Sequence, residues 1–217
     1  MIPNRIRTFT LRAVAAVFAA SLFSAALYAQ TMAPVVPNRI TQTIDNNFRV
    51  TLHGMVNPLA NAANDRGIAP ASMQVDRMHL VLKRSAAQEA ALRSLIQEQN
   101  TPGSPQYHKW LTPAEFGAKF GPSSQDLSKI ESWLQSQGFN GVKVNPGSLT
   151  IEFNGSVAQV AHTFGAQFHR YQVNGKMYDA VANNPQIPAA LAPVVQGFVA
   201  LNNFPVHRDS RVLGQAT

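Results

Sequence analysis

The stretch VDRMHLVLKRSAAQEAALRSLIQEQN, residues 75–100, places a strand pattern directly before a helix pattern. In its first half Met78, Leu80 and Leu82 alternate with His79, Val81 and Lys83. A period of two predicts a strand that buries one face. This half-buried strand is the element around which the rest of the chain is interpreted.

The second half of the same stretch predicts an amphipathic helix that follows the strand without a linker. Ser85 and Gln88 stand at the spacing of a capping box, which marks a helix start. The apolar residues that helical spacing brings to one side are Ala91, Leu92, Leu95 and Ile96. Pro102 and Gly103 then end the helix, because neither residue continues it.

Three further helix starts follow the same capping logic. Thr112, Pro113 and Glu115 predict a short helix that ends at Gly121, and its Phe116 and Phe120 share one face. The other two starts are Ser123 with Asp126, closed by Gly138, and Ser156 with Gln159, closed by Gly165.

Strand patterns elsewhere in the chain predict hairpins. Short alternating segments at 142–144 and 149–153 form one, and Asn174-Gly175 is a two-residue turn typical of another. A first strand is expected near 48–55 and a last one within 194–204, with an irregular segment over 57–73. The predicted fold is α+β, an antiparallel sheet with helices packed on one face, as in a ferredoxin-like sandwich.

The two ends of the chain differ from the part between them. Residues 1–29 combine arginines with an apolar run from Ala13 to Leu27 and small residues near Ala29, which is typical of a cleaved signal peptide. We therefore expect a secreted protein, extracellular or periplasmic, without a stable membrane anchor after cleavage. Residues 30–47 are expected to form an exposed arm, 48–205 the folded domain, and 206–217 a linker or tail.

Charge and cysteine content exclude several classes of function. The leader holds three of the 18 Lys and Arg residues and none of the 11 Asp and Glu, so the remainder has 15 against 11, a net charge of +4. Its basic residues are scattered, which argues against a nucleic-acid partner. With no Cys in the chain, disulfides, thiolate nucleophiles and Cys-ligated metals are impossible.

Motifs for catalysis are missing from the sequence. There is no Gly-x-Ser-x-Gly elbow, no pair of His at helical i, i+4 spacing and no glycine-rich phosphate loop. The carboxylates are explained by caps, helix faces or strand edges; these are Glu115, Asp126, Glu131 and Glu152. We expect no catalytic residue, no bound cofactor and no metal site in this chain.

The connector SPQYHKWLTPAEFGAKFG, residues 104–121, concentrates aromatic side chains. Tyr107, Trp110 and Leu111 are interpreted as packing or interface anchors rather than chemical groups, since aromatics dominate both cores and interfaces.

These segments together resemble a known family. The stretch from Asp76 to Phe139 resembles the activation propeptide, pro-kumamolisin type, of sedolisin-type serine-carboxyl peptidases. VTLHGMVNPLANAANDRG (50–67) and IEFNGSVAQVAHTFGAQFHRY (151–171) are similar to other parts of the same propeptide. The most specific piece is Tyr107, His108, Lys109, Trp110, Leu111, Thr112 and Pro113.

The resemblance implies a protease-propeptide-like sandwich that helps a peptidase domain to fold and inhibits it until acid-triggered processing. The family's Ser, Glu and Asp catalytic set and its calcium site belong to the peptidase domain, and none of their positions matches this sequence. The expected partner is such a domain, in cis as part of a precursor or in trans. The alternative is a secreted α+β binding module with a non-peptidase partner.

Two further groups of residues are predicted to act in release. His79, His108 and His169 are expected at surface or edge positions, where protonation would weaken the complex. Processing is expected in the tail, near His207, Arg208 and Arg211.

Overall fold

The structure, a computed structural model, describes residues 36–205. The predicted signal peptide and the predicted processing residues His207, Arg208 and Arg211 lie outside this range. The strands are β1 (Arg49–Thr51), β2 (Asp65–Ile68), β3 (Gln74–Leu82), β4 (Asn140–Val144), β5 (Thr150–Ser156), β6 (Phe168–Val173), β7 (Lys176–Val181), β8 (Gln186–Pro188) and β9 (Val195–Val199). The helices are α2 (Ala86–Asn100), α3 (Pro113–Phe120), α4 (Ser124–Ser136), α5 (Val157–Phe164) and the 3-10 turn η1 (Ala189–Leu191).

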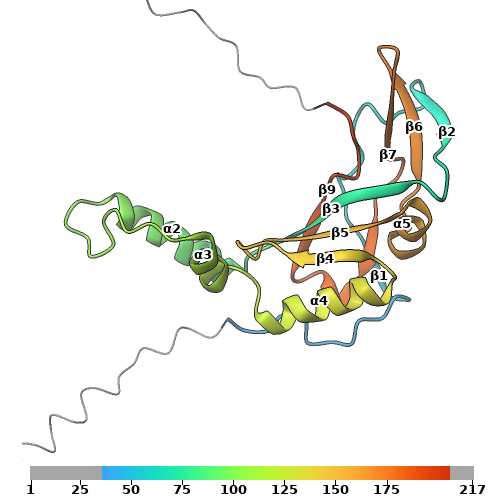
Figure 1. The fold of residues 1–217 in the computed structure, drawn as a ribbon. Helices are drawn as coiled ribbons and strands as arrows, with labels where there is room; N and C mark the ends of the chain where they lie inside the picture. The colour runs from blue at the N-terminus through green and yellow to red at the C-terminus, as the bar shows by residue number, and fades with distance from the viewer. Residues whose placement is uncertain (1–35, 206–217) are drawn as a thin grey trace, which may run out of the picture. The chain divides into compact units, whose positions relative to one another are not determined.

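The central sheet has four antiparallel strands in the order β4-β5-β3-β9 (Figure 1). β3 is hydrogen-bonded on both sides, with Leu80 opposite Ile151 of β5 and Phe198 of β9. As the alternation predicts, Met78, Leu80 and Leu82 of β3 are buried.

Two smaller antiparallel sheets complete the strands. β2, β6 and β7 form one, in that order, and β1 pairs with β8 in the other. The predicted Asn174-Gly175 turn joins β6 to β7, and both residues have positive φ, 50° and 76°. A two-residue turn of this kind matches the right-handed twist of its strands.

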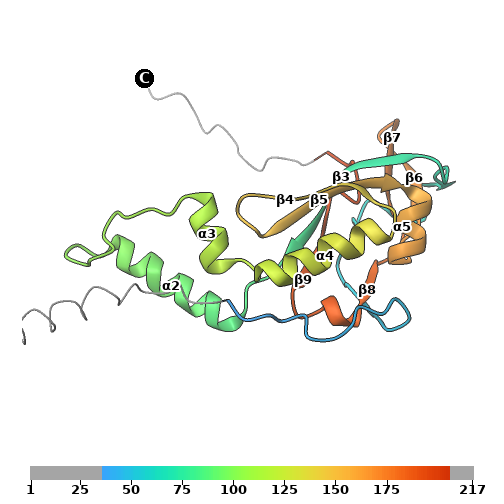
Figure 2. The same ribbon diagram turned by 60° about the horizontal axis from the view of Figure 1, so that its bottom comes forward.

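Helices α4 and α5 cover one face of the central sheet (Figure 2). Their apolar sides meet those of β3, β5 and β9 in a cluster of aromatic rings, with Phe164 and Phe198 centroids 4.7 Å apart and Phe139 and Phe153 centroids 5.0 Å apart. The ring of Trp133 packs edge-on against that of Phe164 in the same cluster. The predicted α+β antiparallel sandwich with helices on one face is therefore confirmed.

Helix boundaries agree with the predicted caps. Ser85, Thr112 and Ser156 each accept a backbone N–H three residues later in a complete capping box, and Ser123 accepts the N–H of Asp126. Gly165 ends α5 in the left-handed region at φ 61°, where a glycine carries no steric penalty.

α2, α3 and the loop between them form a helical arm, residues 86–120, outside the layers made by the sheets, α4 and α5 (Figures 1 and 2). α2 packs against α3, and its predicted apolar side is buried only at Leu95, while Ile96 is 50% exposed. Gly117 of α3 approaches the β4–β5 turn so closely that a Cβ there would lie 2.7 Å from Ser148 Oγ. This close approach attaches the arm to the rest of the fold.

The prediction that residues 30–47 form an exposed arm is wrong for the described part of that segment. Residues 36–47 run along α4 as a strap, and Ile40 is fully buried. The buried carboxylate of Asp126 accepts the backbone N–H of Arg39 and of Ile40, each at 2.9 Å. A solvent-exposed arm would leave this carboxylate without partners, which explains the difference.

A strand was also missed within the segment expected to be irregular. β2 has the sequence DRGI, which shows no alternation, and its last three residues are exposed. It forms because β6 offers a free edge, so tertiary pairing rather than local pattern decides it. The first predicted strand, 48–55, is shorter than expected and is β1.

Within residues 36–205, none of the helices has the length and apolar character needed to cross a bilayer.

Replacing Asp126 with Ala leaves the buried N–H groups of Arg39 and Ile40 without an acceptor. We expect the free energy of unfolding to fall by about 3 kcal/mol in urea denaturation. The control is Asp76→Ala, an exposed carboxylate of β3, with an expected change under about 0.5 kcal/mol. Equal effects of the two substitutions would contradict the assignment of the strap as a structural element.

Candidate functional surface

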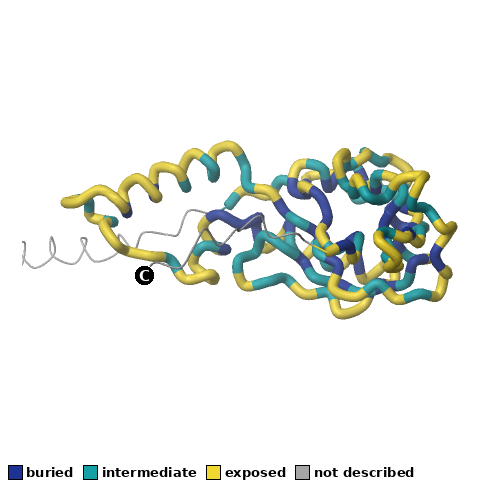
Figure 3. Tube along the Cα trace, turned by 90° about the horizontal axis from the view of Figure 1, so that it is seen from above, coloured by how far each residue is buried: buried dark blue, intermediate teal, exposed yellow. Residues whose placement is uncertain are grey.

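The predicted signature residues lie on the helical arm, in the loop between α2 and α3 and at the start of α3. Tyr107 and Trp110 have exposed side chains, 39% and 66%, in a part of the fold that is largely solvent-facing (Figure 3). Leu111 is half-buried, whereas Thr112 and Pro113 begin α3. The structure thus divides the run from Tyr107 to Pro113, since Tyr107, His108 and Trp110 are exposed whereas Thr112 and Pro113 begin α3.

Stacked rings form an aromatic ladder of Tyr107, His108 and Trp110. The ring centroids of Tyr107 and His108 are 3.8 Å apart at an interplanar angle of 23°. Those of His108 and Trp110 are 6.0 Å apart at 22°. Three nearly parallel rings on consecutive or alternate residues thus line one part of the loop.

The loop that carries the ladder is held by Gln99, a polar residue at the end of α2 that is only 6% exposed. Its backbone carbonyl accepts the N–H of His108 at 3.0 Å, and its side-chain amide donates to the carbonyl of Lys109. His108 itself has φ 56°, a left-handed conformation that is uncommon for a non-glycine residue. Gln99 was not singled out from the sequence, because a glutamine in a last helical turn carries no pattern.

The start of α3 is fixed by Thr112 and Glu115. Glu115 Oε2 accepts the N–H of Thr112 at 2.7 Å and its hydroxyl at 2.8 Å. The backbone hydrogen bond from Thr112, followed by the hydroxyl, holds the pKa of Glu115 below its usual range. The charged form of this carboxylate accepts the cap hydrogen bonds and stabilises the helix start.

Two of the three predicted pH-sensing histidines have acidic partners inside the chain. His79 Nε2 lies 3.8 Å from Glu152 Oε2, and His169 Nδ1 lies 2.8 Å from Asp65 Oδ2. The strands that carry them, β3 and β6, are each paired on both sides, so of the expected surface or edge positions neither histidine has an edge position. Both side chains are about one fifth exposed, 23% and 18%.

His108 differs from these two histidines because it is exposed and stacks on Tyr107. The structure places the three residues on separate parts of the fold: the central sheet, the helical arm and the β2-β6-β7 sheet. Whether any of them senses pH stays a prediction.

Asp65 is the most strongly engaged of the acidic partners. The N–H of Gly67 donates to it at 2.7 Å, and this bond, together with the contact to His169, lowers the pKa of Asp65. Burial, with a smaller effect of the Asp65 charge, raises the pKa of neighbouring Tyr171. Asp65 therefore keeps its charge, and its partner His169, into the acidic range.

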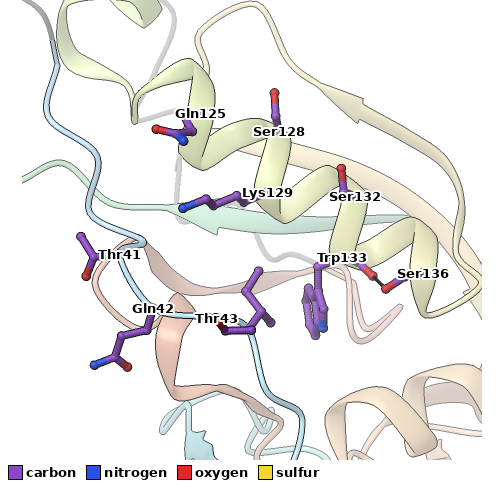
Figure 4. A pocket seen from close by; sticks show the side chains of 10 residues that line it. Thr41, Gln42, Thr43, Gln125, Ser128, Lys129, Ser132, Trp133 and Ser136 are labelled. Atoms are coloured by element: carbon purple, nitrogen blue, oxygen red, sulfur yellow. Dashed lines mark hydrogen bonds between the residues drawn. The ribbon is translucent and has the colours of Figure 1, made fainter.

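A groove of about 660 Å³ lies between the strap and α4 (Figure 4). Its lining carries hydroxyl and amide groups with one cation, Lys129, whose Nζ donates to the carbonyl of Ile40. No His, Asp or Glu is among the lining residues, which are Thr41, Gln42, Thr43, Ile44, Gln125, Ser128, Lys129, Ser132, Trp133 and Ser136. The groove thus offers no general base to activate its hydroxyls.

Over the range 36–205, the His, Asp and Glu side chains form no group of three that could hold a metal ion.

Comparisons with known proteins point to one family. The sequence model of the Pro-kumamolisin activation domain matches residues 61–204. The chain is similar to sedolisin from Pseudomonas sp. (strain 101), with 32% identity over 125 residues, 58% of this chain and 21% of sedolisin. It is also similar to xanthomonalisin from Xanthomonas sp. (strain T-22), with 28% identity over 64% of this chain and 17% of that protein.

A third similar protein is tripeptidyl-peptidase 1 from Mus musculus, 34% identical over 52% of this chain and 21% of that protein. In all three cases the matched segment spans about a fifth of the relative's length.

The Asp65–His169 contact gives a pH-dependent prediction. Because the pKa of Asp65 is lowered in the fold, its contribution to stability is present above its unfolded pKa of about 3.9 and is lost as the pH falls through the folded value. Asp65→Asn should therefore lower the melting temperature at neutral pH, and the difference from the original chain should shrink as the pH falls through the lowered pKa of Asp65 in the folded chain.

Asp76→Asn, at an exposed carboxylate, is the control for this melting series and should leave the melting temperature unchanged. A difference for Asp65→Asn that stays constant across the pH range would refute the role of its ionised carboxylate.

Proposed function

Because the chain belongs to the Pro-kumamolisin activation domain family, we propose that it is the propeptide of a sedolisin-type peptidase and acts as its inhibitor and folding assistant. The observation that carries this proposal is the match over residues 61–204, which contains every element from β2 to β9. The similarity to sedolisin, xanthomonalisin and tripeptidyl-peptidase 1 supports it.

The proposed mode of action is binding rather than catalysis. An inhibitor of this kind excludes substrate by covering a surface of roughly 800 Å² on its partner, and it needs no nucleophile of its own. The described domain suits that role, because it has a packed core and carries exposed aromatic side chains on a helical arm.

The partner is proposed to be a sedolisin-type peptidase domain, in cis or in trans. The segments of the relatives that match this chain are about a fifth of their lengths, so most of each relative has no counterpart here. A propeptide that binds its peptidase non-covalently can be assayed as a separate chain in either case.

The ends of the chain are part of the same proposal. Residues 1–29 would direct export and be removed, and processing would fall near His207, Arg208 and Arg211. Intact-mass measurement of exported material tests both, since the two cuts give different mass losses.

Release at acidic pH is proposed to depend on His108 more than on His79 or His169. Protonated His79 and His169 would each face a carboxylate of the same chain, which strengthens contacts inside the propeptide. His108 is exposed, so its charge acts directly on a bound surface.

We expect His108→Gln to shift the pH at which inhibition is lost, and His79→Gln and His169→Gln to leave it near the original value. The measurement is the midpoint of inhibition against pH for each variant. If replacing all three histidines leaves the midpoint unchanged, the histidines do not control release.

The decisive experiment for the function is inhibition in trans. The purified chain is mixed with mature sedolisin from Pseudomonas and, separately, with mature xanthomonalisin, and peptidase activity is measured from acidic to neutral pH. We expect inhibition that is strongest at the least acidic pH at which the peptidase remains active. Recovery of activity from denatured peptidase, with and without the chain, tests the folding role.

The Asp126→Ala chain is the matched control, since it loses the acceptor of two strap N–H groups while its exposed surface keeps the same composition. At a temperature above its melting point but below that of the original chain, it should lose inhibition while the original chain still inhibits. This difference would mean that inhibition requires the folded domain. Failure of the original chain to inhibit either peptidase would overturn the proposal and favour a binding module with a non-peptidase partner.

A further inference from the structure

The aromatic ladder is an exposed feature that the fold of the domain does not require. Trp110 is 66% exposed and Tyr107 is 39% exposed, so neither ring is needed to fill the core. Large aromatic rings are usually buried, and Trp and Tyr are enriched among the residues that dominate binding at interfaces. The exposed rings of the ladder are therefore typical of a surface that binds a partner.

The loop that presents the ladder is held by hydrogen bonds to the end of α2 and within its own turns. Gln99 binds it at two successive residues, through the N–H of His108 and the carbonyl of Lys109. Further backbone bonds close the turns before it, from Tyr107 N–H to Ser104 and from Lys109 N–H to Gln106, both at 3.0 Å. Binding by such a loop loses less conformational entropy than binding by a mobile one.

His108 adds a second sign that the loop is built for display. Its φ of 56° is a costly conformation for a residue with a Cβ, yet a glycine at that position would remove the strain and the ring together. The ring it contributes lies between those of Tyr107 and Trp110. The strained backbone at His108 is thus accompanied by a stack of three rings.

The charge around the ladder indicates the chemistry of the surface that it fits. Along residues 101–112 the only charged side chain is Lys109, and His108 is the only imidazole. Glu115, the next carboxylate along the chain, is engaged by Thr112 in the α3 cap. A complementary surface is apolar, with carboxylates at its rim.

From these features we infer that the aromatic ladder is a preformed docking site for an apolar depression, rimmed by carboxylates, on the peptidase domain. This inference rests on the proposed function and names the surface that would carry it. Trp110 and Tyr107 are the anchors, and Gln99 is a positioning residue that acts through the loop. The partner domain is the larger portion of the relatives that has no counterpart in this chain.

Fluorine NMR tests the contact directly, because the chain has two tryptophans, one in the ladder and one in the core. In a chain labelled with fluorotryptophan, Trp133 is 5% exposed and reports the core, whereas Trp110 reports the ladder. The partner is sedolisin from Pseudomonas with its catalytic serine replaced by alanine, so that it binds without cleaving. We expect the Trp110 resonance to shift and that of Trp133 to stay in place.

Inhibition of sedolisin by variants gives the energetic test. Trp110→Ala and Tyr107→Ala should each weaken inhibition roughly thirty-fold, the effect of losing a strong interface anchor, with unchanged melting temperatures. Phe48→Ala is the matched control, since it removes an aromatic ring that is 70% exposed outside the arm. It should inhibit as the original chain does.

Two further variants test the contribution of the middle ring and the support of the loop by Gln99. His108→Gly keeps the left-handed backbone and removes the middle ring, and it should weaken inhibition less than Trp110→Ala. Gln99→Ala should weaken inhibition through slower association, because the loop must first order, while Tyr107 and Trp110 remain present. The melting temperature of Gln99→Ala is measured as well. If it falls, weaker inhibition by this variant reflects loss of stability, and Trp110→Ala and Tyr107→Ala decide the inference.

The outcomes distinguish the inference from the function on which it rests. If the original chain inhibits and Trp110→Ala and Tyr107→Ala inhibit equally well, the ladder is not the docking site and the propeptide function stands. If the Trp133 resonance shifts and that of Trp110 does not, docking occurs elsewhere on the domain. If the original chain binds neither peptidase, both proposals are overturned.

Discussion

The double pairing of β3 is the constraint on which the rest of the structure depends. Its backbone is hydrogen-bonded to β5 on one side and to β9 on the other, while Met78, Leu80 and Leu82 turn toward the helices. A strand paired on both sides and covered on one face leaves α4 and α5 a single apolar layer to pack against. The aromatic cluster around Phe164 fills that layer, so the sheet and the helices stabilise each other.

Much of this arrangement could be predicted from the sequence, because local chemistry decided it. The capping boxes at Ser85, Thr112 and Ser156 each satisfy backbone N–H groups through nearby side chains, so they act whatever the tertiary context. The strap and β2 could not be predicted in the same way. The strap is held by a carboxylate on α4 that accepts the backbone N–H of Ile40, and β2 exists because β6 offers an edge for pairing. Both partners lie far away along the chain.

The candidate surface shows the same division between local and distant causes. Tyr107 and Trp110 were singled out as aromatic residues, and the structure places them in the loop between α2 and α3, where both are exposed. Gln99, which holds their loop, carried no sequence signal, because its role depends on the return of the chain to the end of α2. The histidines were recognised by type, but their carboxylate partners Glu152 and Asp65 become apparent only in three dimensions.

The strap has a kinetic consequence as well. Its two hydrogen bonds to Asp126 connect residues that are 87 and 86 positions apart in the sequence. The pairing of β3 with β9 spans a still longer separation. Folds dominated by such distant contacts order slowly, because loop closure precedes the energy that rewards it. If the domain acts as the proposed folding assistant, it must complete its own slow folding before it can assist its partner. The contact order of this domain would then set the order in which the two partners fold.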